Sequence, residues 1–218
     1  MFLLVCVVVA ISLIPTPHVG EEHRKSQCSL NLRLIGLAFL QYHKEEKCFP
    51  APVINVRTTG QKYSWRVALL PYIGANGIYA AYHFDEPWNG PSNLQLLPSI
   101  PSDYYCPASH VKQGCTSYVM VVDAQDCEQN GCETNAEPKF IRIVEITRIN
   151  IPWTKPSDIR LDEMSYQIND SARIGISSEH PGGAHVLHSD GTVEFLRDTL
   201  APGLVREKLM VGRSEGKE

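Results

Sequence analysis

A helical repeat of apolar residues is the longest pattern in the chain and runs from Glu21 to about Glu46. Apolar side chains recur at steps of four, three, four and three, which places them on one face of an α-helix. They are Cys28, Leu32, Ile35, Phe39 and Tyr42, and we expect Leu30, Leu34 and Leu37 to widen this face. A coiled-coil partner is the competing interpretation, but about two heptads are too few to favour it. The pattern therefore predicts a long helix that packs on a sheet.

The clearest β pattern lies near the C-terminus, between residues 179 and 196, where two short apolar runs flank a polar turn. Asp190-Gly191 in such a turn predicts a hairpin, because the turn needs positive φ and glycine adopts it without steric cost. Gly182 and Gly183 let the chain enter the first strand sharply. We expect this hairpin to be a central part of a β-sheet.

Shorter patterns predict the remaining elements. Strands are expected at 117–122, 140–149 and 173–177, short helices at 77–82 and 201–211, and loops at 85–91 and 123–138. Ser157 and Asp158 are placed to cap a short helical turn. Together these elements predict an α+β fold, with one long N-terminal helix packed on an antiparallel β-sheet and loop-rich insertions.

The first twenty residues form an apolar segment without Lys, Arg, Asp or Glu. Its core, residues 2–14, is short for a membrane span, which needs about 20 residues. The length fits the apolar part of a signal peptide, although no basic region precedes it and no Ala-x-Ala site follows. We expect an apolar leader or membrane segment at 1–20, a single domain at 21–211 and a flexible tail at 212–218.

Composition narrows the class of protein. A chain of 218 residues is long enough for one sizeable domain. The net charge is −4, and no run of Lys and Arg exceeds two residues, so we expect no nucleic-acid partner. No phosphate loop, dinucleotide fingerprint or Gly-x-Ser-x-Gly motif is present, and we expect neither enzymatic activity nor a cofactor.

Seven cysteines are many for a cytosolic protein of this size and favour an oxidising compartment. One lies in the apolar segment. The spacing of the last four is irregular and contains no Cys-x-x-Cys motif, which favours disulfides over zinc. We expect Cys127 to pair with Cys132 across an Asn-Gly turn, and secondly Cys106 to pair with Cys115.

Four polar residues of the C-terminal region have the chemistry of metal ligands: His180, His185, His188 and Asp190. His185 and His188 are three residues apart on a predicted strand, so their side chains should face opposite sides of the sheet. Zinc requires three or four convergent ligands. We therefore expect no metal site here. Asp190 should instead accept local backbone N–H bonds, and His180 should satisfy a nearby backbone group.

The spacing of His180, nine residues, then Asp190-Gly191 resembles the C-terminal element of a large bacterial family of unknown function. Members of that family usually begin with a prepilin-type cleavage and methylation segment, and the cleavage site itself is absent here. Other similar pieces follow in the same order: 26–28, 31–32, 35–37, 42–43, 49–50, 64–67, 70–72, 85–88, 106–107 and 152–154. The resemblance covers about residues 26–211.

The resemblance implies a pilin-like fold and a non-enzymatic structural or assembly protein similar to a pseudopilin. Such a protein is anchored in the inner membrane or exported, with its domain in the cell envelope outside the cytosol. The membrane, through the N-terminal segment, and other protein copies are then its expected partners. The residues of the family motif are expected to have structural roles: His180, Pro181, Gly182, Gly183, Asp190 and Gly191.

Two alternatives lie in other functional classes. Related sequences are sometimes labelled as solute-binding domains, which suggests a periplasmic or cell-surface ligand-binding module, and a pocket lined by tryptophans would favour it. A metal-dependent enzyme is the second alternative, and it requires His180, His188 and Asp190 to converge on one point.

Overall fold

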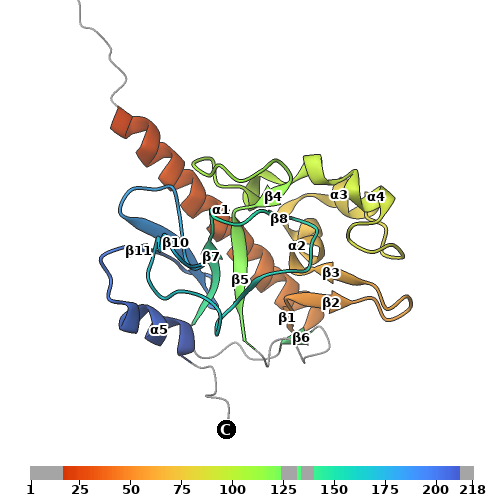
Figure 1. The fold of residues 1–218 in the computed structure, drawn as a ribbon. Coiled ribbons are helices and arrows are strands. Elements are labelled where there is room, and N and C mark those ends of the chain that lie inside the picture. The colour runs from red at the N-terminus through yellow and green to blue at the C-terminus, as the bar shows by residue number, and fades with distance from the viewer. Residues whose placement is uncertain (1–16, 124–131, 134–139, 212–218) are drawn as a thin grey trace, which may run out of the picture.

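A computed structural model describes residues 17–123, 132–133 and 140–211. The long helix α1 (Pro17–Glu46) crosses a central five-stranded sheet of order β11-β10-β7-β5-β9 (Figure 1). These strands are β5 (Tyr118–Val122), β7 (Ile141–Glu145), β9 (Ile159–Arg160), β10 (Gly183–His188) and β11 (Val193–Arg197). The predicted α+β fold, with a long N-terminal helix on a sheet, is confirmed. One edge departs from the antiparallel pattern, because β9 pairs with β5 in parallel.

Short elements build the loop-rich remainder. The small pairs are β1 (Phe49–Pro50) with β6 (Cys132–Glu133), β2 (Val53–Asn55) with β3 (Lys62–Ser64), and β4 (Cys115–Thr116) with β8 (Ile151–Pro152). The short helices are α2 (Trp65–Ala68), η1 (Leu70–Ile73), α3 (Asn76–Ala81), α4 (Pro91–Leu94), η2 (Leu97–Ser99) and η3 (Ser102–Tyr104), with α5 (Pro202–Met210) near the C-terminus.

Helix α1 has apolar side chains on two opposite sides. Cys28, Leu32 and Ile35 are fully buried against the sheet, as the repeat predicts. The expected widening of that face is wrong: Leu30, Leu34 and Leu37 are 47%, 38% and 62% exposed. At about 100° per residue, these leucines point roughly opposite to the buried face. Among the described residues, no helix combines the length and hydropathy that a membrane span requires.

The ends of α1 follow from local chemistry. The helix begins at Pro17, four residues before the expected start, because proline in a first helical turn gives up no hydrogen bond. It ends at Glu46, as predicted, and the next residue, Lys47, has a φ of 62°. The predicted tail at 212–218 and most of the predicted leader lie outside the described residues.

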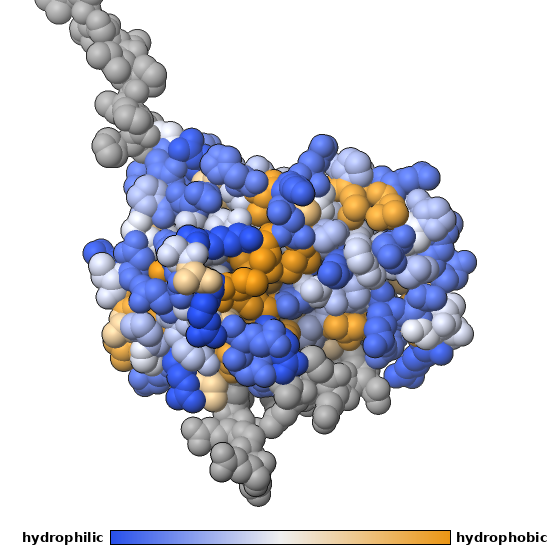
Figure 2. Space-filling model, viewed as in Figure 1, coloured by the Kyte–Doolittle hydropathy of each residue, from blue (hydrophilic) through white to orange (hydrophobic). Residues whose placement is uncertain are grey.

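The sheet separates two apolar layers. Buried residues of α1 pack against Tyr118, Met120 and Ile143 on one side. On the other side, residues of the 159–176 segment and of α5 pack against Val119, Val144 and their neighbours. Figure 2 shows hydrophobic residues at the centre of one face of the molecule, surrounded by hydrophilic ones.

The C-terminal hairpin forms as predicted, but it does not occupy the middle of the sheet. Strand β10 pairs with both β11 and β7, whereas β11 is an edge strand. Gly191 has a φ of 82°, and Asp190 Oδ1 accepts hydrogen bonds from the Thr192 N–H at 3.0 Å and the Thr192 hydroxyl at 2.7 Å. The strand predicted at 173–177 is wrong, since this segment makes only one isolated bridge, between Ser165 and Gly175.

A buried ion pair joins α2 to the chain next to β9. Arg66 Nη2 lies 2.7 Å from Asp158 Oδ1, and the two side chains are 0% and 1% exposed. The same oxygen accepts hydrogen bonds from Trp65 Nε1 and the Met120 N–H. Burial raises the pKa of Asp158, and the charge of Arg66 opposes that shift. Asp158 therefore anchors α2, rather than capping the helical turn expected there.

Candidate functional site: a buried sulfur, imidazole and carboxylate cluster

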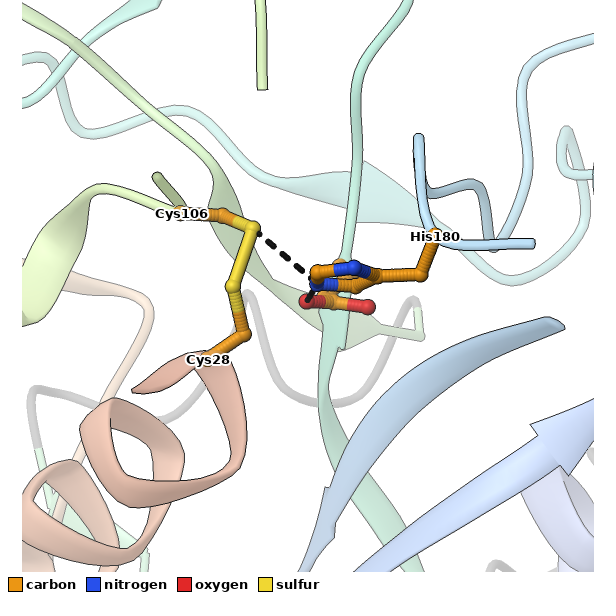
Figure 3. Close-up of side chains that lie close together, drawn as sticks. Cys28, Cys106 and His180 are labelled. Carbon is orange, nitrogen blue, oxygen red and sulfur yellow. Dashed lines mark hydrogen bonds and ion pairs between the residues drawn. A yellow bond between two sulfur atoms is a disulfide. The ribbon is translucent and has the colours of Figure 1, made fainter. Parts of the chain in front are cut away.

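Four buried side chains from distant parts of the sequence meet beside α1. They are Cys28 on α1, Cys106 after η3, Glu145 at the end of β7 and His180 in the loop before β10. One ligand atom of each lies within 4.8 Å of the others. Figure 3 shows the ring of His180 pointing at the disulfide between Cys28 and Cys106.

The disulfide joins α1 to the segment after η3, across 78 residues of sequence. One turn after Cys28, the amide nitrogen of Asn31 donates to the carbonyl oxygens of Ser102 and Tyr105, which holds that segment against the helix. The expected pairing of Cys106 with Cys115 is wrong, because Cys115 is a free, buried cysteine.

The first-choice disulfide of the sequence prediction cannot be compared with the fold. Cys127 lies outside the described residues, and the side chain of Cys132 does too. Cys48, at the end of the loop after α1, is disulfide-bonded.

His180 makes its ring contacts with side chains, so the expected contact with a backbone group is wrong. Its Nδ1 lies 2.6 Å from Glu21 Oε1 on the first turns of α1. Its Nε2 lies 3.4 Å from Cys106 Sγ and 3.7 Å from Glu145 Oε1. Because an ionised carboxylate only accepts, Nδ1 carries the proton that is shared with Glu21. The ring therefore links α1, the disulfide and the sheet.

Glu145 is an almost fully buried carboxylate with one bonded and one unbonded oxygen. Its Oε2 accepts the His185 N–H at 2.7 Å and lies 3.5 Å from His185 Nδ1. Its Oε1 has no hydrogen-bond partner and faces His180. The backbone N–H of Ser177 donates to the Glu145 carbonyl at 3.0 Å, which brings the His180 loop to this strand. A buried oxygen without a partner is costly, and such a group calls for a physical explanation.

Glu21 carries the charge at the outer side of the cluster. Burial alone would raise the pKa of its carboxyl, but the hydrogen bonds from His180 and Arg24 outweigh burial, and the pKa is lowered below 4.5. Arg24 Nη2 lies 2.6 Å from Glu21 Oε2. Glu21 is therefore ionised at neutral pH and holds the first turns of α1 to His180.

A polar cleft of about 400 Å³ lies next to the cluster, between α1 and the hairpin. Its lining is mostly polar, with one leucine: Glu22, Lys25, Ser26, Ser29, Leu30, Arg33 and His185. His185 thus separates the cleft from Glu145. Of the three tryptophans considered for a binding pocket, Trp65 and Trp153 are fully buried and serve as packing anchors. Trp88 is half-buried, and Lys155 Nζ lies 5.8 Å from the centre of its ring.

The metal-ligand set of the second alternative does not converge. His188 Nε2 bonds Glu194 Oε2 at 2.9 Å, and Glu194 in turn pairs with Lys208 on α5. Asp190 bonds Thr192 in the turn. His185 contacts the α1 side of the sheet and His188 the α5 side, which confirms that the two face opposite ways.

Gly183 has a direct steric role in the motif. A Cβ at this position would collide with the carbonyl oxygen of Leu196 on the neighbouring strand. Its φ of 157° is also one that other residues rarely adopt. Only glycine allows β10 and β11 to approach here, directly after the loop that carries His180.

Comparison with known families shows to which family the chain belongs. A family model described as "Protein of unknown function (DUF1559)" matches residues 20–140 and 125–203. The chain belongs to this family. No curated protein and no solved structure matches it at a significant level. The DUF1559 match spans all four cluster residues and both strands of the hairpin.

Sequence reasoning missed the cluster although it had named three of its four members, Cys28, Cys106 and His180. Cys28 and Cys106 each lie in a short piece that resembles the DUF1559 family, and pairing these two pieces would have found the disulfide. Glu21 and Glu145 carry no such signal. Each is one acidic residue among 24, and only the fold brings them to His180.

Proposed function

We propose that this DUF1559 protein is a non-enzymatic structural or assembly protein of the cell envelope, similar to a pseudopilin. Its N-terminal segment would hold it at the membrane, with the domain outside the cytosol. The observation that carries the proposal is the leucine stripe, Leu30, Leu34 and Leu37, on the outer side of α1. A long helix that buries one face on its own sheet and exposes leucines on the other is suited to pack against a second copy.

The position of α1 supports this proposal. Its N-terminal end extends beyond the body of the domain (Figure 1), and residues 20 to 27 are all exposed or half-buried. The helix begins within the uncharged segment of the sequence, at Pro17. If the N-terminal segment is held at the membrane, a helical connection of this kind would bring the leucine stripe close to the membrane surface, where neighbouring copies would meet.

A second copy is the occupant that fits the leucine stripe. Leu30, Leu34 and Leu37 follow steps of four and three, the spacing of a seam between two helices. The same helix in another copy presents the same stripe, so the surface can pack on itself. Burial of three half-exposed leucines is favourable at about 25 cal/mol per Å² of apolar surface.

Assembly is tested with charge substitutions in the stripe. The full chain, in membranes or mild detergent, is cross-linked and sized by sedimentation for wild type and for the Leu34→Glu, Leu37→Glu double variant. We expect oligomers of the wild type and their loss in the double variant. Leu204→Glu on α5 is the matched control, since Leu204 is 49% exposed and lies outside the stripe. A monomeric wild type, or equal assembly of all three proteins, would count against the proposal.

Location is tested by fractionation. We expect the full-length chain in the membrane or envelope fraction, because twenty uncharged residues at the N-terminus are unfavourable in water. Sequencing of the mature N-terminus identifies any processing. Recovery of full-length protein mainly from the soluble cytosol would overturn the envelope assignment.

A further inference from the structure

We propose that the buried cluster binds one zinc ion when its disulfide is reduced. The ligands are the thiolates of Cys28 and Cys106, His180 Nε2 and Glu145 Oε1. Two sulfurs, one imidazole nitrogen and one carboxylate oxygen form a donor set of the type that tetrahedral zinc takes in proteins. This inference does not depend on the proposed envelope function.

Two of the distances between ligand atoms already match a tetrahedral site. Ligand atoms about 2.0–2.3 Å from a tetrahedral zinc ion lie about 3.3–3.8 Å from one another. His180 Nε2 lies 3.4 Å from Cys106 Sγ and 3.7 Å from Glu145 Oε1. The two sulfurs, while bonded to each other, are too close together to share an ion. Reduction lets them separate, so the disulfide excludes the metal and the dithiol admits it.

Two further contacts point to a ligand at the centre. Glu145 Oε1 is buried, has no hydrogen-bond partner and faces His180, and a metal ion would satisfy it. On the far side of the ring, Glu21 accepts from His180 Nδ1 at 2.6 Å. In a neutral imidazole this bond fixes the tautomer whose Nε2 lone pair faces the sulfurs. Histidine ligands of metals commonly make such a bond to a carboxylate.

The chemistry balances with a dithiol as the reductant. Thiol–disulfide exchange breaks the Cys28–Cys106 bond, gives the protein two thiols and converts the dithiol to its own disulfide. Zinc binding then forms two metal–sulfur bonds and releases the two thiol protons to solvent. We therefore expect the zinc-bound form under reducing conditions and the disulfide form in an oxidising compartment.

Zinc titration of the full chain in mild detergent tests the inference. The protein is reduced with dithiothreitol, which is removed without oxygen, and free thiols are counted by alkylation. Zn²⁺ is then titrated against a competing chelating dye. Co²⁺ in a parallel sample reports thiolate ligation by its charge-transfer absorption. We expect one tight Zn²⁺ site in the reduced wild type and none in the oxidised protein.

Variants separate this site from adventitious binding. His180→Gln and Glu145→Gln should each weaken binding at least tenfold, and Glu21→Gln should weaken it about 10- to 100-fold through loss of the His180 orientation. Cys115→Ser removes a buried thiol outside the cluster and should bind as the wild type does. Circular dichroism checks the fold of each protein.

Three results would overturn the inference. The first is a reduced wild type that binds Zn²⁺ no more tightly than the Cys28→Ser, Cys106→Ser variant. The second is wild-type affinity in both His180→Gln and Glu145→Gln. The third is a reduced chain that unfolds and that Zn²⁺ does not refold.

Discussion

His180 joins the C-terminal motif to the start of α1. It belongs to the C-terminal motif, yet its ring contacts Glu21 at the start of α1. The same ring faces the Cys28–Cys106 disulfide and Glu145 on β7. A single imidazole therefore connects the helix, the disulfide and the sheet, which gives this motif residue a physical role that its local sequence does not suggest.

The Glu21–His180 bond predicts a pH dependence of stability. The folded-state pKa of Glu21 is lowered below 4.5, so its stabilising contribution is complete above that value and is lost as pH falls through the folded pKa. The difference in unfolding free energy between wild type and Glu21→Gln should therefore shrink on acidification from about pH 5. Denaturant titrations of both proteins at several pH values below about 5 measure this difference. Glu22→Gln removes the same charge without contacting His180, and equal effects of both variants at every pH would contradict the prediction.

Substitution of Gly191 should destabilise the fold through backbone strain, whereas substitution of a glycine with ordinary φ should not. Gly191→Ala places a side chain at a φ of 82° and against Leu40 on α1, and should cost about 1–3 kcal/mol. Gly203 in α5 has nothing near its Cβ direction, so Gly203→Ala should be neutral or stabilising by up to about 1 kcal/mol. Thermal melts of both proteins decide it. Similar losses in the two variants would refute the turn explanation.

At the scale of elements, the Arg66–Asp158 pair fixes a short helix to the sheet. Helix α2 has only four residues and could not be stable alone. Arg66 also donates to the Tyr118 carbonyl from Nε and Nη2, and the Tyr104 hydroxyl donates to the Arg66 carbonyl. The motif piece that contains Trp65 and Arg66 thus holds α2, β5 and β9 in one polar network.

Removal of one partner of this pair should be strongly destabilising. Asp158→Asn leaves Arg66 buried without a counter-charge and should cost about 3–5 kcal/mol. The exposed Asp162, which pairs with Arg160, is the control, and Asp162→Asn should leave stability nearly unchanged. Urea unfolding compares the two. The prediction fails if both substitutions have similarly small effects.

At the scale of the whole molecule, the Cys28–Cys106 disulfide closes a long covalent loop. It connects the N-terminal helix with the loop-rich middle across 78 residues. Asn31 adds hydrogen bonds between the same two segments. The disulfide joins α1 to the loop-rich middle of the chain, and His180 joins it to the loop before β10.

Loss of this disulfide should lower global stability. For a loop of 78 residues the chain-entropy model gives about 4–5 kcal/mol for the Cys28→Ser, Cys106→Ser variant. Cys115→Ser, which removes a sulfur but no disulfide, should cost much less. Thermal and denaturant unfolding measure both, and intact-mass analysis confirms the bond in the wild type. Equal stability of wild type and double variant would contradict the prediction.

The sequence alone determined the features that local physics controls. The period of apolar residues identified α1 and its end at Glu46, because a helix repeats every 3.6 residues whatever surrounds it. Asp190-Gly191 identified the hairpin turn, because its positive φ is a local requirement. The α+β class followed from these two elements and the strands between them.

Tertiary structure decided everything that depends on distant residues. The outer leucines of α1 were misassigned, because apolar character alone does not say which of two sides meets the sheet. The pairing of Cys28 with Cys106, and the approach of Glu21 and Glu145 to His180, join residues 35 to 159 positions apart. No local pattern encodes such contacts, since they arise only when α1, β7 and the His180 loop pack around one buried point.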